Sequence, residues 1–523
     1  MTLDAEVTVD DEMTLDNSRS FPCRSGIAWI LLGALLLGAG SLLYPWTERD
    51  SASAAYIGAR ILEGQAPYRD AWNVKGPGIN FAYALSNLFF GKSAAGLRVF
   101  DLLWQTATAL LLAMATTRIY KNSSVGRIAA LVYLTAYFSQ NYWNWGEADG
   151  LLSLPLAMTL WYALRAQEND RFLFWMLAGV GVGIATLFKS PWGLFGLAIL
   201  AAGLAQEGGL VDRAVRRPAA LAAGFGLPVA TAGIYLFWKN ALTDFWATQF
   251  LLAPEYVARL RAAASAKCVL ATFVQPVRVP LIMLAAIGLW SMVTTVASRK
   301  RLSTPELLLL AWTFIAAFTL VMHGAYLAYH FLPFFAPLAI LCAPPIYAAC
   351  KAVGEKRRSA VWLALAALAL VVPAKKIGQH YAVAVNTLRG RVEPGVWNTL
   401  GTFLNQRTAP QDRIFVWGNA PVIYLYADRL SSSRFIQTWF LTTPWRKVDY
   451  RPAFLAEFAA HRPRYFVLLK AEPDQGCVPM FLGSQETFEQ FAALRNIVAE
   501  EYQVEKDEPL YRIYRQKQPR SSP

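Results

Sequence analysis

Two acids and a lysine stand close together after the first long apolar run of the chain. Glu48 and Asp50 follow this run directly, and Lys75 precedes a Gly-Pro-Gly turn in "NVKGPG". A carboxylate at a membrane boundary can act as a general base, and a lysine placed by a rigid turn can neutralise a developing negative charge. The pattern therefore indicates proton abstraction beside an anionic group, with Asp50 or Glu48 as the base.

Each of these residues also has an ordinary structural role open to it. Asp50 stands where an N-cap would accept backbone N–H bonds, and Glu48 fits an interfacial carboxylate. Lys75 has a stem long enough to reach lipid headgroups. Arg69 and Asp70, in the same segment, are predicted to form only a surface ion pair. The residue types alone leave these alternatives open.

Further ionisable residues recur near the ends of later apolar runs. Glu147 and Asp149 lie in "NWGEADG", where acids also favour the N-terminal dipole of a helix. Lys189 in "LFKSPWG" and His330 in "YHFLPFF" stand near the predicted outer ends of spanning segments. Ionisable residues in that position are candidate site residues. A hydrogen-bonded interfacial histidine is the alternative for His330, and His323 is the weaker candidate of the two histidines.

The composition is that of a polytopic membrane protein with an additional soluble part. The 523 residues are 55% hydrophobic and 16% charged, whereas ordinary soluble domains are about 25% charged. The net charge of +14 lies mostly in short basic clusters between apolar runs. Such clusters signal membrane topology and not a nucleic-acid-binding face.

Cysteine and histidine usage gives no sign of a metal site. The five cysteines contain no CxxC pair, and the chain has only four histidines. This predicts no disulfide framework and no metal centre. We expect no cofactor, and a divalent cation is compatible with the sequence but not indicated by it.

About eleven apolar segments approach or reach the 17 to 25 residues that a spanning helix needs. They are 27–44, 97–117, 125–142, 150–164, 172–188, 191–206, 219–238, 279–298, 306–322, 331–350 and 359–374. The first is predicted to be a retained helix and not a signal peptide. With the N-terminus inside, every predicted inner loop is basic, and the acids of the first two outer loops fall outside. We therefore expect a cytoplasmic tail (1–26), a transmembrane domain (27–378) and an extracytoplasmic C-terminal domain (379–523).

The first outer loop, 45–96, is too long for a simple connector. Its apolar residues fall on one helical face over 51–63, which predicts an amphipathic helix lying in the membrane interface. A second interfacial helix is predicted near 79–90. The loop therefore has the architecture of a functional segment.

The C-terminal domain is predicted to be a small α/β unit. Its expected strands are "RIFVWG", "RYFVLLK" and "PLYRIYR", and its expected helices cover 451–461 and 484–502, with Ser484 as an N-cap. No catalytic cluster stands out in this domain. Trp417, Tyr424 and Arg434 are predicted to be core and surface residues.

The first loop, "ERDSASAAYIGARILEGQAPYRDAWNVKGPG", resembles the signature of membrane glycosyltransferases of the GT-C superfamily. The nearest resemblance is to the family that includes protein O-mannosyltransferases and the aminoarabinose or galacturonic-acid transferases of lipopolysaccharide. In that family an acid after the first helix is followed by an interfacial helix, a "G-x-x-P-Y-x-D" turn and a "K-P-P/G" element. This chain has "ERD" where "DE" or "DG" is commoner, and "NVKGPG" where "DHKPPG" is expected, so Glu48 remains open as an alternative to Asp50.

The resemblance implies a GT-C fold and a set of site residues. That set is catalytic Asp50 or Glu48, donor-binding Lys75, Lys189, His330 and Tyr68, and the second-loop acids Glu147 and Asp149.

The implied activity is inverting transfer of a sugar from a polyprenyl-phosphate donor to a hydroxyl on the outer face of the membrane. The acceptor would be lipid A or another glycan, or a protein, and the sequence identifies neither sugar nor acceptor. Implied partners are the lipid-linked sugar, the acceptor and membrane lipids, without nucleic acid, in the bacterial inner membrane. A transporter or lipid flippase is the alternative, but transporters place ionisable residues near the midplane and show repeated halves.

Overall fold

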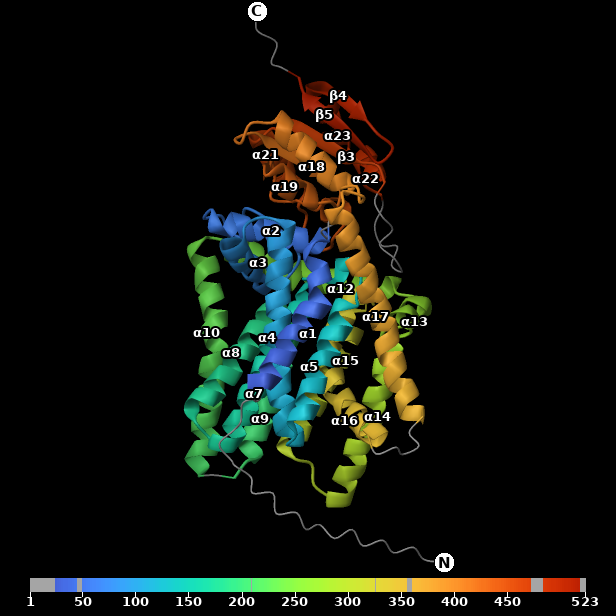
Figure 1. Cartoon of the computed structure of the whole chain (residues 1–523). Coiled ribbons are helices and arrows are strands. Elements are labelled where there is room, and N and C mark those ends of the chain that lie inside the picture. Colours follow the sequence, from blue (N-terminus) through green and yellow to red (C-terminus); the bar gives the residue numbers. More distant parts are fainter. Residues whose placement is uncertain are drawn as a thin grey trace, which may run out of the picture.

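The computed structural model describes residues 24–44, 49–207, 209–324, 326–354, 360–471 and 483–517. Long helices form an elongated bundle, and a small domain built on a five-stranded sheet sits on one end of it (Figure 1). This is the predicted fold class, a helical polytopic protein with a C-terminal α/β domain.

Each predicted spanning segment coincides with a helix of the bundle. The helices are α1 (Arg24–Leu42), α4 (Ala94–Tyr120), α5 (Ser123–Phe138), α7 (Ser153–Asn169), α8 (Phe172–Phe188), α9 (Leu194–Ala205), α10 (Arg217–Trp238), α14 (Arg278–Arg299), α15 (Thr304–His323), α16 (Phe335–Gly354) and α17 (Ala360–Leu388). Within the described part of the chain, five helical stretches are long and apolar enough to cross a membrane, and three shorter ones are apolar. The count of about eleven spans stays a prediction.

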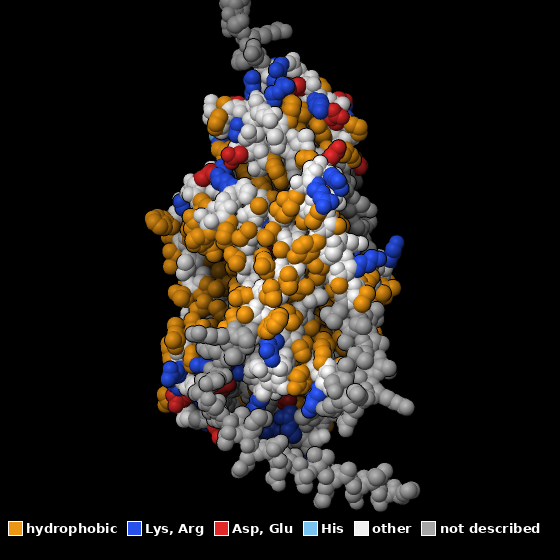
Figure 2. Space-filling view, viewed as in Figure 1, with side chains coloured by type: hydrophobic (Ala, Val, Ile, Leu, Met, Phe, Trp, Pro, Cys, Tyr) orange, Lys and Arg blue, Asp and Glu red, His pale blue; other side chains and the backbone are white. Residues whose placement is uncertain are grey.

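The outer surface of the bundle is apolar. Trp290, Phe314 and Phe237 are each more than 70% exposed, and hydrophobic side chains cover the face of the bundle shown in Figure 2, while charged side chains gather toward its two ends. Soluble monomers rarely expose contiguous apolar patches larger than a few hundred Å². The protein is therefore an integral membrane protein whose bundle faces lipid.

The end of the bundle opposite the sheet domain carries the basic loops. Arg118 Nε lies 3.0 Å from Glu168 Oε1, and Asp170 binds Arg216 at 2.8 Å and Arg217 at 2.9 Å. These residues come from three different helix ends, which they hold together. They belong to loops predicted to be cytoplasmic, and the orientation of this end remains a prediction.

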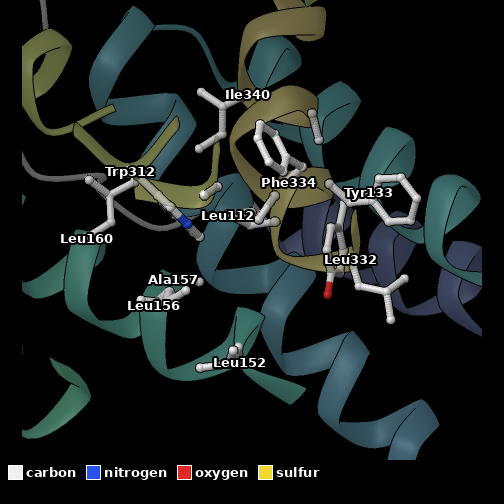
Figure 3. Close-up of a cluster of buried hydrophobic side chains, with 14 of the residues drawn as sticks. Leu112, Tyr133, Leu152, Leu156, Ala157, Leu160, Trp312, Leu332, Phe334 and Ile340 are labelled. Carbon is white, nitrogen blue, oxygen red and sulfur yellow. The ribbon is translucent and has the colours of Figure 1, made fainter. Parts of the chain in front are cut away.

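Helices from both halves of the chain share one core. Figure 3 shows part of it, built from α4, α5, α7, α15, α16 and the 3₁₀ segment η5 (Ala328–Phe334). The labelled residues from these elements with at most 1% exposure are Leu112, Tyr133, Leu156, Ala157, Leu160, Trp312, Leu332 and Ile340. Lipid is as apolar as these aliphatic side chains, so close van der Waals packing, and not removal from water, holds the helices together here. The packing places η5 against α6 (Ala148–Leu151), α15 and α16.

Two helices occupy the first outer loop, α2 (Arg49–Leu62) and α3 (Pro77–Phe90), close to the predicted 51–63 and 79–90. Helix α2 is amphipathic, as predicted, but all its residues from Ser51 to Arg60 are buried, so protein covers its polar residues as well as its apolar ones. The sheet domain packs on the side of α2 that carries Ala52, Tyr56 and Ile57, and Phe435 of this domain forms a parallel β-bridge with Trp72. Ser431 N donates to Tyr56 Oη at 3.0 Å, and the Tyr56 ring lies 5.4 Å from that of Tyr424.

The sheet has the strand order β2-β1-β3-β5-β4. Its strands are β1 (Arg413–Trp417), β2 (Leu430–Ser431), β3 (Tyr465–Leu469), β4 (Tyr502–Asp507) and β5 (Tyr511–Gln516). Strand β1 pairs in parallel with β2 and β3, and β5 pairs antiparallel with β3 and β4. The three predicted strands are confirmed. Two strands were missed, because β2 has two residues and β4 is mostly polar and exposed.

The helices of this domain are α18 (Val396–Arg407), α19 (Val422–Ala427), α20 (Trp439–Thr442), α21 (Arg451–Ala460), α22 (Ser484–Gln490) and α23 (Ala492–Glu501). The predicted helix 484–502 is two helices, interrupted at Phe491, whose ψ of 75° is not helical. The N-cap is Gly483 and not Ser484, which already lies in the first turn of α22. Trp417 and Tyr424 are core residues, as predicted, at 0% and 1% exposure.

Candidate active site

Lys75 joins two acids that are far from it in the sequence. Its Nζ lies 2.7 Å from Asp50 Oδ2 and 3.0 Å from Glu147 Oε2. Asp50 is in the first turn of α2, and Glu147 is the N-cap residue of the short helix α6 (Ala148–Leu151). The Glu147 side chain is fully buried, so its charge depends on a partner. The structure thus brings three predicted site residues into one cluster.

The Gly-Pro-Gly turn places Lys75 because it approaches the end of α8 too closely for any side chain. A Cβ on Gly76 would lie 2.4 Å from the carbonyl oxygen of Leu187, and one on Gly78 would lie 2.8 Å from the backbone nitrogen of Phe188. Only glycine permits such an approach of two backbones. The turn is therefore a fixed support for the lysine.

Two side chains hold this turn from the other side. Tyr68 Oη donates to the carbonyl oxygen of Lys75 at 2.8 Å. Gln249 Nε2 donates to the carbonyl oxygens of Val74 and Lys75, both at 3.1 Å. Tyr68 was predicted to bind the sugar donor. In the structure it is fully buried and holds the backbone of Lys75 in place.

The charges in the cluster stabilise one another. Burial raises the pKa of Asp50, but the charge and hydrogen bond of Lys75, the charge of Arg49 and a hydrogen bond from Gln437 together hold it below its usual value. Burial lowers the pKa of Lys75, yet Asp50 and Glu147 raise it well above its usual value. Asp50 is therefore an ionised carboxylate, the form that accepts a proton, and Lys75 is a cation.

A second buried ion pair stands beside the first. Lys189, the C-cap residue of α8, places Nζ 2.7 Å from both carboxylate oxygens of Asp149. Asp149 lies on α6, two residues after Glu147. One short helix therefore carries the acids that hold both lysines.

Tyrosines from neighbouring helices hold the segment before α6. Tyr83 Oη donates to the carbonyl oxygen of Gly146 at 2.8 Å. Gly146 N donates to Tyr137 Oη at 3.0 Å, and Tyr137 Oη donates to Asp101 Oδ1 at 2.8 Å. The second outer loop is thereby fixed to α3, α4 and α5.

His330 lies in η5 and is buried, at 8% exposure. Its ring lies 5.1 Å from that of His323 and 4.6 Å from that of Tyr329, and Tyr329 in turn lies under Lys75 Nζ at 5.4 Å. Among the described residues, His330 Nδ1 has no hydrogen-bond partner. His323, the weaker of the two histidine candidates, is thus the neighbour of His330. The short spacing of the two histidines in "HGAYLAYH" is the sequence signal that could have predicted this contact.

Other predicted positions are also resolved. Arg69 and Asp70 form the predicted ion pair, at 2.6 Å. Glu48 lies outside the described residues, so Asp50 is the one of the two candidate bases whose contacts the structure describes. Among the described residues, no group of three or more His, Cys, Asp and Glu side chains is arranged to hold a metal ion.

The sequence missed the contribution of the C-terminal domain to this site. Gln437, from this domain, is close enough to Asp50 to help lower its pKa. Arg434, predicted to be a core or surface residue, binds Asp244 at 2.8 Å and Glu457 at 2.5 Å and so ties the domain to the segment after α10. No local motif marks either residue, because Asp50 is 387 positions from Gln437 and Asp244 is 190 positions from Arg434.

Comparison with known proteins finds a family model and a curated relative that each match part of the chain. Residues 74–238 match the family model described as dolichyl-phosphate-mannose-protein mannosyltransferase. A curated relative, undecaprenyl phosphate-alpha-4-amino-4-deoxy-L-arabinose arabinosyl transferase 2 of Proteus mirabilis, is 26% identical over 271 residues, which are 50% of this chain and 47% of the relative. The match thus spans about half the length of that relative.

Solved structures share the fold. ArnT from Cupriavidus metallidurans bound to undecaprenyl phosphate has a TM-score of 0.55 at 14% identity, over 96% of this chain and 100% of that chain. The Archaeoglobus fulgidus oligosaccharyltransferase tethered with an acceptor peptide has a TM-score of 0.50 at 13% identity, over 85% of this chain and 69% of that chain. The chain therefore has the fold of these membrane glycosyltransferases, and its match to the mannosyltransferase family model agrees with the resemblance of its first loop.

Proposed function

We propose that the protein is an inverting glycosyltransferase that moves a sugar from a polyprenyl-phosphate donor to a hydroxyl acceptor. The observation that carries this proposal is the buried Asp50–Lys75 ion pair, 2.7 Å apart, with the Lys189–Asp149 ion pair beside it. This arrangement supplies a base and two cations in one place. The names of the relatives support a lipid-phosphate donor, since one acts on an undecaprenyl-phosphate sugar and another binds undecaprenyl phosphate.

The geometry supports a single displacement. Asp50 takes the proton of the acceptor hydroxyl while the hydroxyl oxygen attacks the anomeric carbon. The bond from that carbon to the donor phosphate oxygen breaks on the opposite face, and the phosphate leaves with the electron pair. Phosphate needs no added proton to leave, so a second acidic carboxyl, as used in most glycoside hydrolysis, is not required.

Lys75, Lys189 and His330 are the proposed partners of the departing phosphate. Cations already in place stabilise charge as it develops without reorganising at that moment. Glu147 and Asp149 then have the role of holding the two lysines. Because both lysines pair with acids at α6, the proposed phosphate-binding groups are held at fixed positions relative to Asp50.

The lipid-facing bundle fits a donor whose tail lies among the helices and whose headgroup reaches the outer loops. We place the reaction on the extracytoplasmic side of the bacterial inner membrane, with the N-terminus in the cytoplasm. The acceptor is a lipid A or other glycan hydroxyl, or a protein hydroxyl. A transporter is not favoured. The ionisable residues of the candidate site gather at the end of the bundle next to the sheet domain, and the relatives are transferases.

Asp50→Asn tests the proposal in membranes that contain the full-length protein. With a polyprenyl-phosphate-linked sugar and envelope extract as acceptor, we expect a loss of about 10²- to 10⁴-fold in transfer rate. The matched control is Asp70→Asn, which changes another first-loop acid outside the cluster and should stay near wild type. Undiminished transfer by Asp50→Asn at normal expression would overturn the assignment, and lost uptake with intact transfer would favour the transporter. Mass spectrometry of envelope glycans from cells lacking the protein would name the sugar and acceptor.

A further inference from the structure

Asp101 is a buried acid inside the helical bundle that the proposed displacement does not use. Its side chain belongs to α4, which is long and apolar enough to cross a membrane, and the residue is 3% exposed. It lies beyond the first turn of α4, where the helix dipole no longer favours an acid. Ionisable residues within spanning helices are rare and are held by specific partners, so they are candidates for a functional role.

One oxygen of Asp101 accepts two hydrogen bonds from neutral side chains. Gln105 Nε2 donates to Asp101 Oδ1 at 2.9 Å, and Tyr137 Oη donates to the same oxygen at 2.8 Å. Gln105 Oε1 in turn accepts from Tyr133 Oη at 2.5 Å. These three partners are all buried. Asp101 Oδ1 is therefore the acceptor at the centre of a buried network that joins α4 to α5.

Tyr137 extends this network to the second outer loop. Gly146 N donates to Tyr137 Oη at 3.0 Å. A tyrosine hydroxyl has a single hydrogen, and because Asp101 accepts that hydrogen, the lone pairs of the oxygen remain for the N–H of Gly146. The tyrosine ring also packs against α6, since a Cβ on Gly150 would lie 2.9 Å from Tyr137 Cε2. Tyr137 thus contacts the chain both before and after the acids that bind the two lysines.

The segment between these two contacts holds both lysine pairs of the candidate site. Glu147 Oε2 lies 3.0 Å from Lys75 Nζ, and Asp149 Oδ1 lies 2.7 Å from Lys189 Nζ. Cations that stabilise a leaving phosphate are effective when they are already in place. A displacement of about 1 Å in a site group can lower a rate about 100-fold. Movement of this one segment would displace both lysines together.

We propose that Asp101 is a positioning residue of the transferase: its Oδ1 accepts the hydrogen of Tyr137, and Tyr137 thereby holds the segment that carries both lysine pairs. The inference rests on the proposed function. This role requires an acceptor at Oδ1 and no negative charge, because both partners of that oxygen are neutral donors. Asparagine keeps the shape and presents a carbonyl oxygen there, whereas leucine keeps the branching without an acceptor. The two substitutions therefore separate the hydrogen bond from the charge.

The test measures sugar transfer from a polyprenyl-phosphate donor by full-length variants in lipid nanodiscs. Asp101→Leu should lower kcat roughly ten- to one-hundredfold, whereas Asp101→Asn should recover most of the wild-type rate. Tyr137→Phe keeps the ring on Gly150 but loses both hydrogen bonds, so it should show the same loss even if Asp101→Leu does not fold. The double variant should lose no more than either single variant, because both act through one contact.

Tyr133→Phe is the matched control. It removes another buried tyrosine hydroxyl from α5, one that donates to Gln105, and the transfer rate should stay near wild type. An equal loss in Tyr133→Phe and Tyr137→Phe would overturn the positioning role, because it would reflect helix packing in general. A loss in Asp101→Asn as large as in Asp101→Leu would also overturn it, since the charge would then be required.

Hydrogen exchange of the peptide that contains Gly146 and Asp149 tests the contact without turnover. Exchange should be faster in Tyr137→Phe and Asp101→Leu than in the wild type, and close to the wild type in Asp101→Asn. Unchanged exchange in Tyr137→Phe would overturn the inference even if transfer is observed. If the wild type transfers no lipid-phosphate sugar, the proposed function fails, and the exchange result still decides whether Asp101 holds this segment.

Discussion

Lys75 balances two carboxylates at once. Glu147 is fully buried, and its Oε2 lies 3.0 Å from Lys75 Nζ. A buried acid without its cation is far less stable than one in a pair. Sequence could predict Asp50, Lys75 and Glu147 as candidates because their residue types carry the chemistry. It could not predict that one lysine binds both acids, since this depends on the distance between two loops.

Lys75→Met should destabilise the protein by about 3–5 kcal/mol, because it leaves a buried charge without its partner. Unfolding in detergent followed by tryptophan fluorescence measures this loss. Lys92→Met is the control, since Lys92 and Glu63 form a pair 40% exposed on each side and contribute about 0–1 kcal/mol. Equal losses in the two variants would contradict the buried pairing.

The pH dependence of catalysis should show Asp50 as an ionised base. Burial raises the pKa of Asp50, but Lys75 outweighs it and holds the pKa below the usual 3.8. An acid with a depressed folded pKa contributes stability above its unfolded pKa, and this stability is lost as pH falls through the folded pKa. We therefore expect no acid limb from Asp50 in kcat/KM for the donor above about pH 4. In Lys75→Met, burial dominates and any residual activity should show a limb at higher pH; a wild-type limb near neutral pH would be inconsistent with the pair.

At the scale of elements, the spanning helices were predictable and their environment was not. Lipid requires continuous apolar runs, so segments such as 172–188 match α8 residue for residue. The burial of α2 and the break between α22 and α23 were not predictable, because they depend on packing between parts distant in the sequence. The Gly-Pro-Gly turn was identified as rigid, but its reason, contact with the end of α8, needed the structure.

Gly76→Ala should reduce transfer by about 10²-fold, since a Cβ 2.4 Å from the carbonyl oxygen of Leu187 displaces the turn and misplaces Lys75. The transfer rate under saturating donor measures this effect. Gly378→Ala is the control, because a Cβ at Gly378 in α17 meets nothing within 4 Å. Alanine should stabilise that helix by about 0.5–1 kcal/mol and leave transfer intact. Normal activity in Gly76→Ala would show that Lys75 does not depend on this turn.

At the scale of the whole molecule, the bundle and the sheet domain are one unit around the site. Figure 1 shows α2 and α3 between them, and Arg434 binds Asp244 and Glu457 from the two sides. Sequence predicted both parts but not their contact. Residues such as Arg434 carry no motif, and only folding brings them to their partners in the bundle, such as Asp244.

Arg434→Met should loosen this contact by about 1–3 kcal/mol, because two acids lose their partner. Hydrogen exchange of the peptides that contain Trp72 and Phe435 measures the opening, which should be faster there than in α4. Arg451→Met is the control, since Arg451 and Asp449 are about half exposed, at 54% and 49%, and contribute little. Unchanged exchange at Trp72 would show that Arg434 does not hold the domain in place.

The β-bridge between Trp72 and Phe435 has a consequence for engineering new variants. Because the backbone pairing of Trp72 with Phe435 and the Tyr56–Ser431 hydrogen bond both cross from one part to the other, the loop from residue 49 to 78 and the domain after α17 form a matched set. Chimeras with a homologous domain will assemble an intact site when both pieces come from the same parent. Exchanging either piece alone joins surfaces that were selected separately.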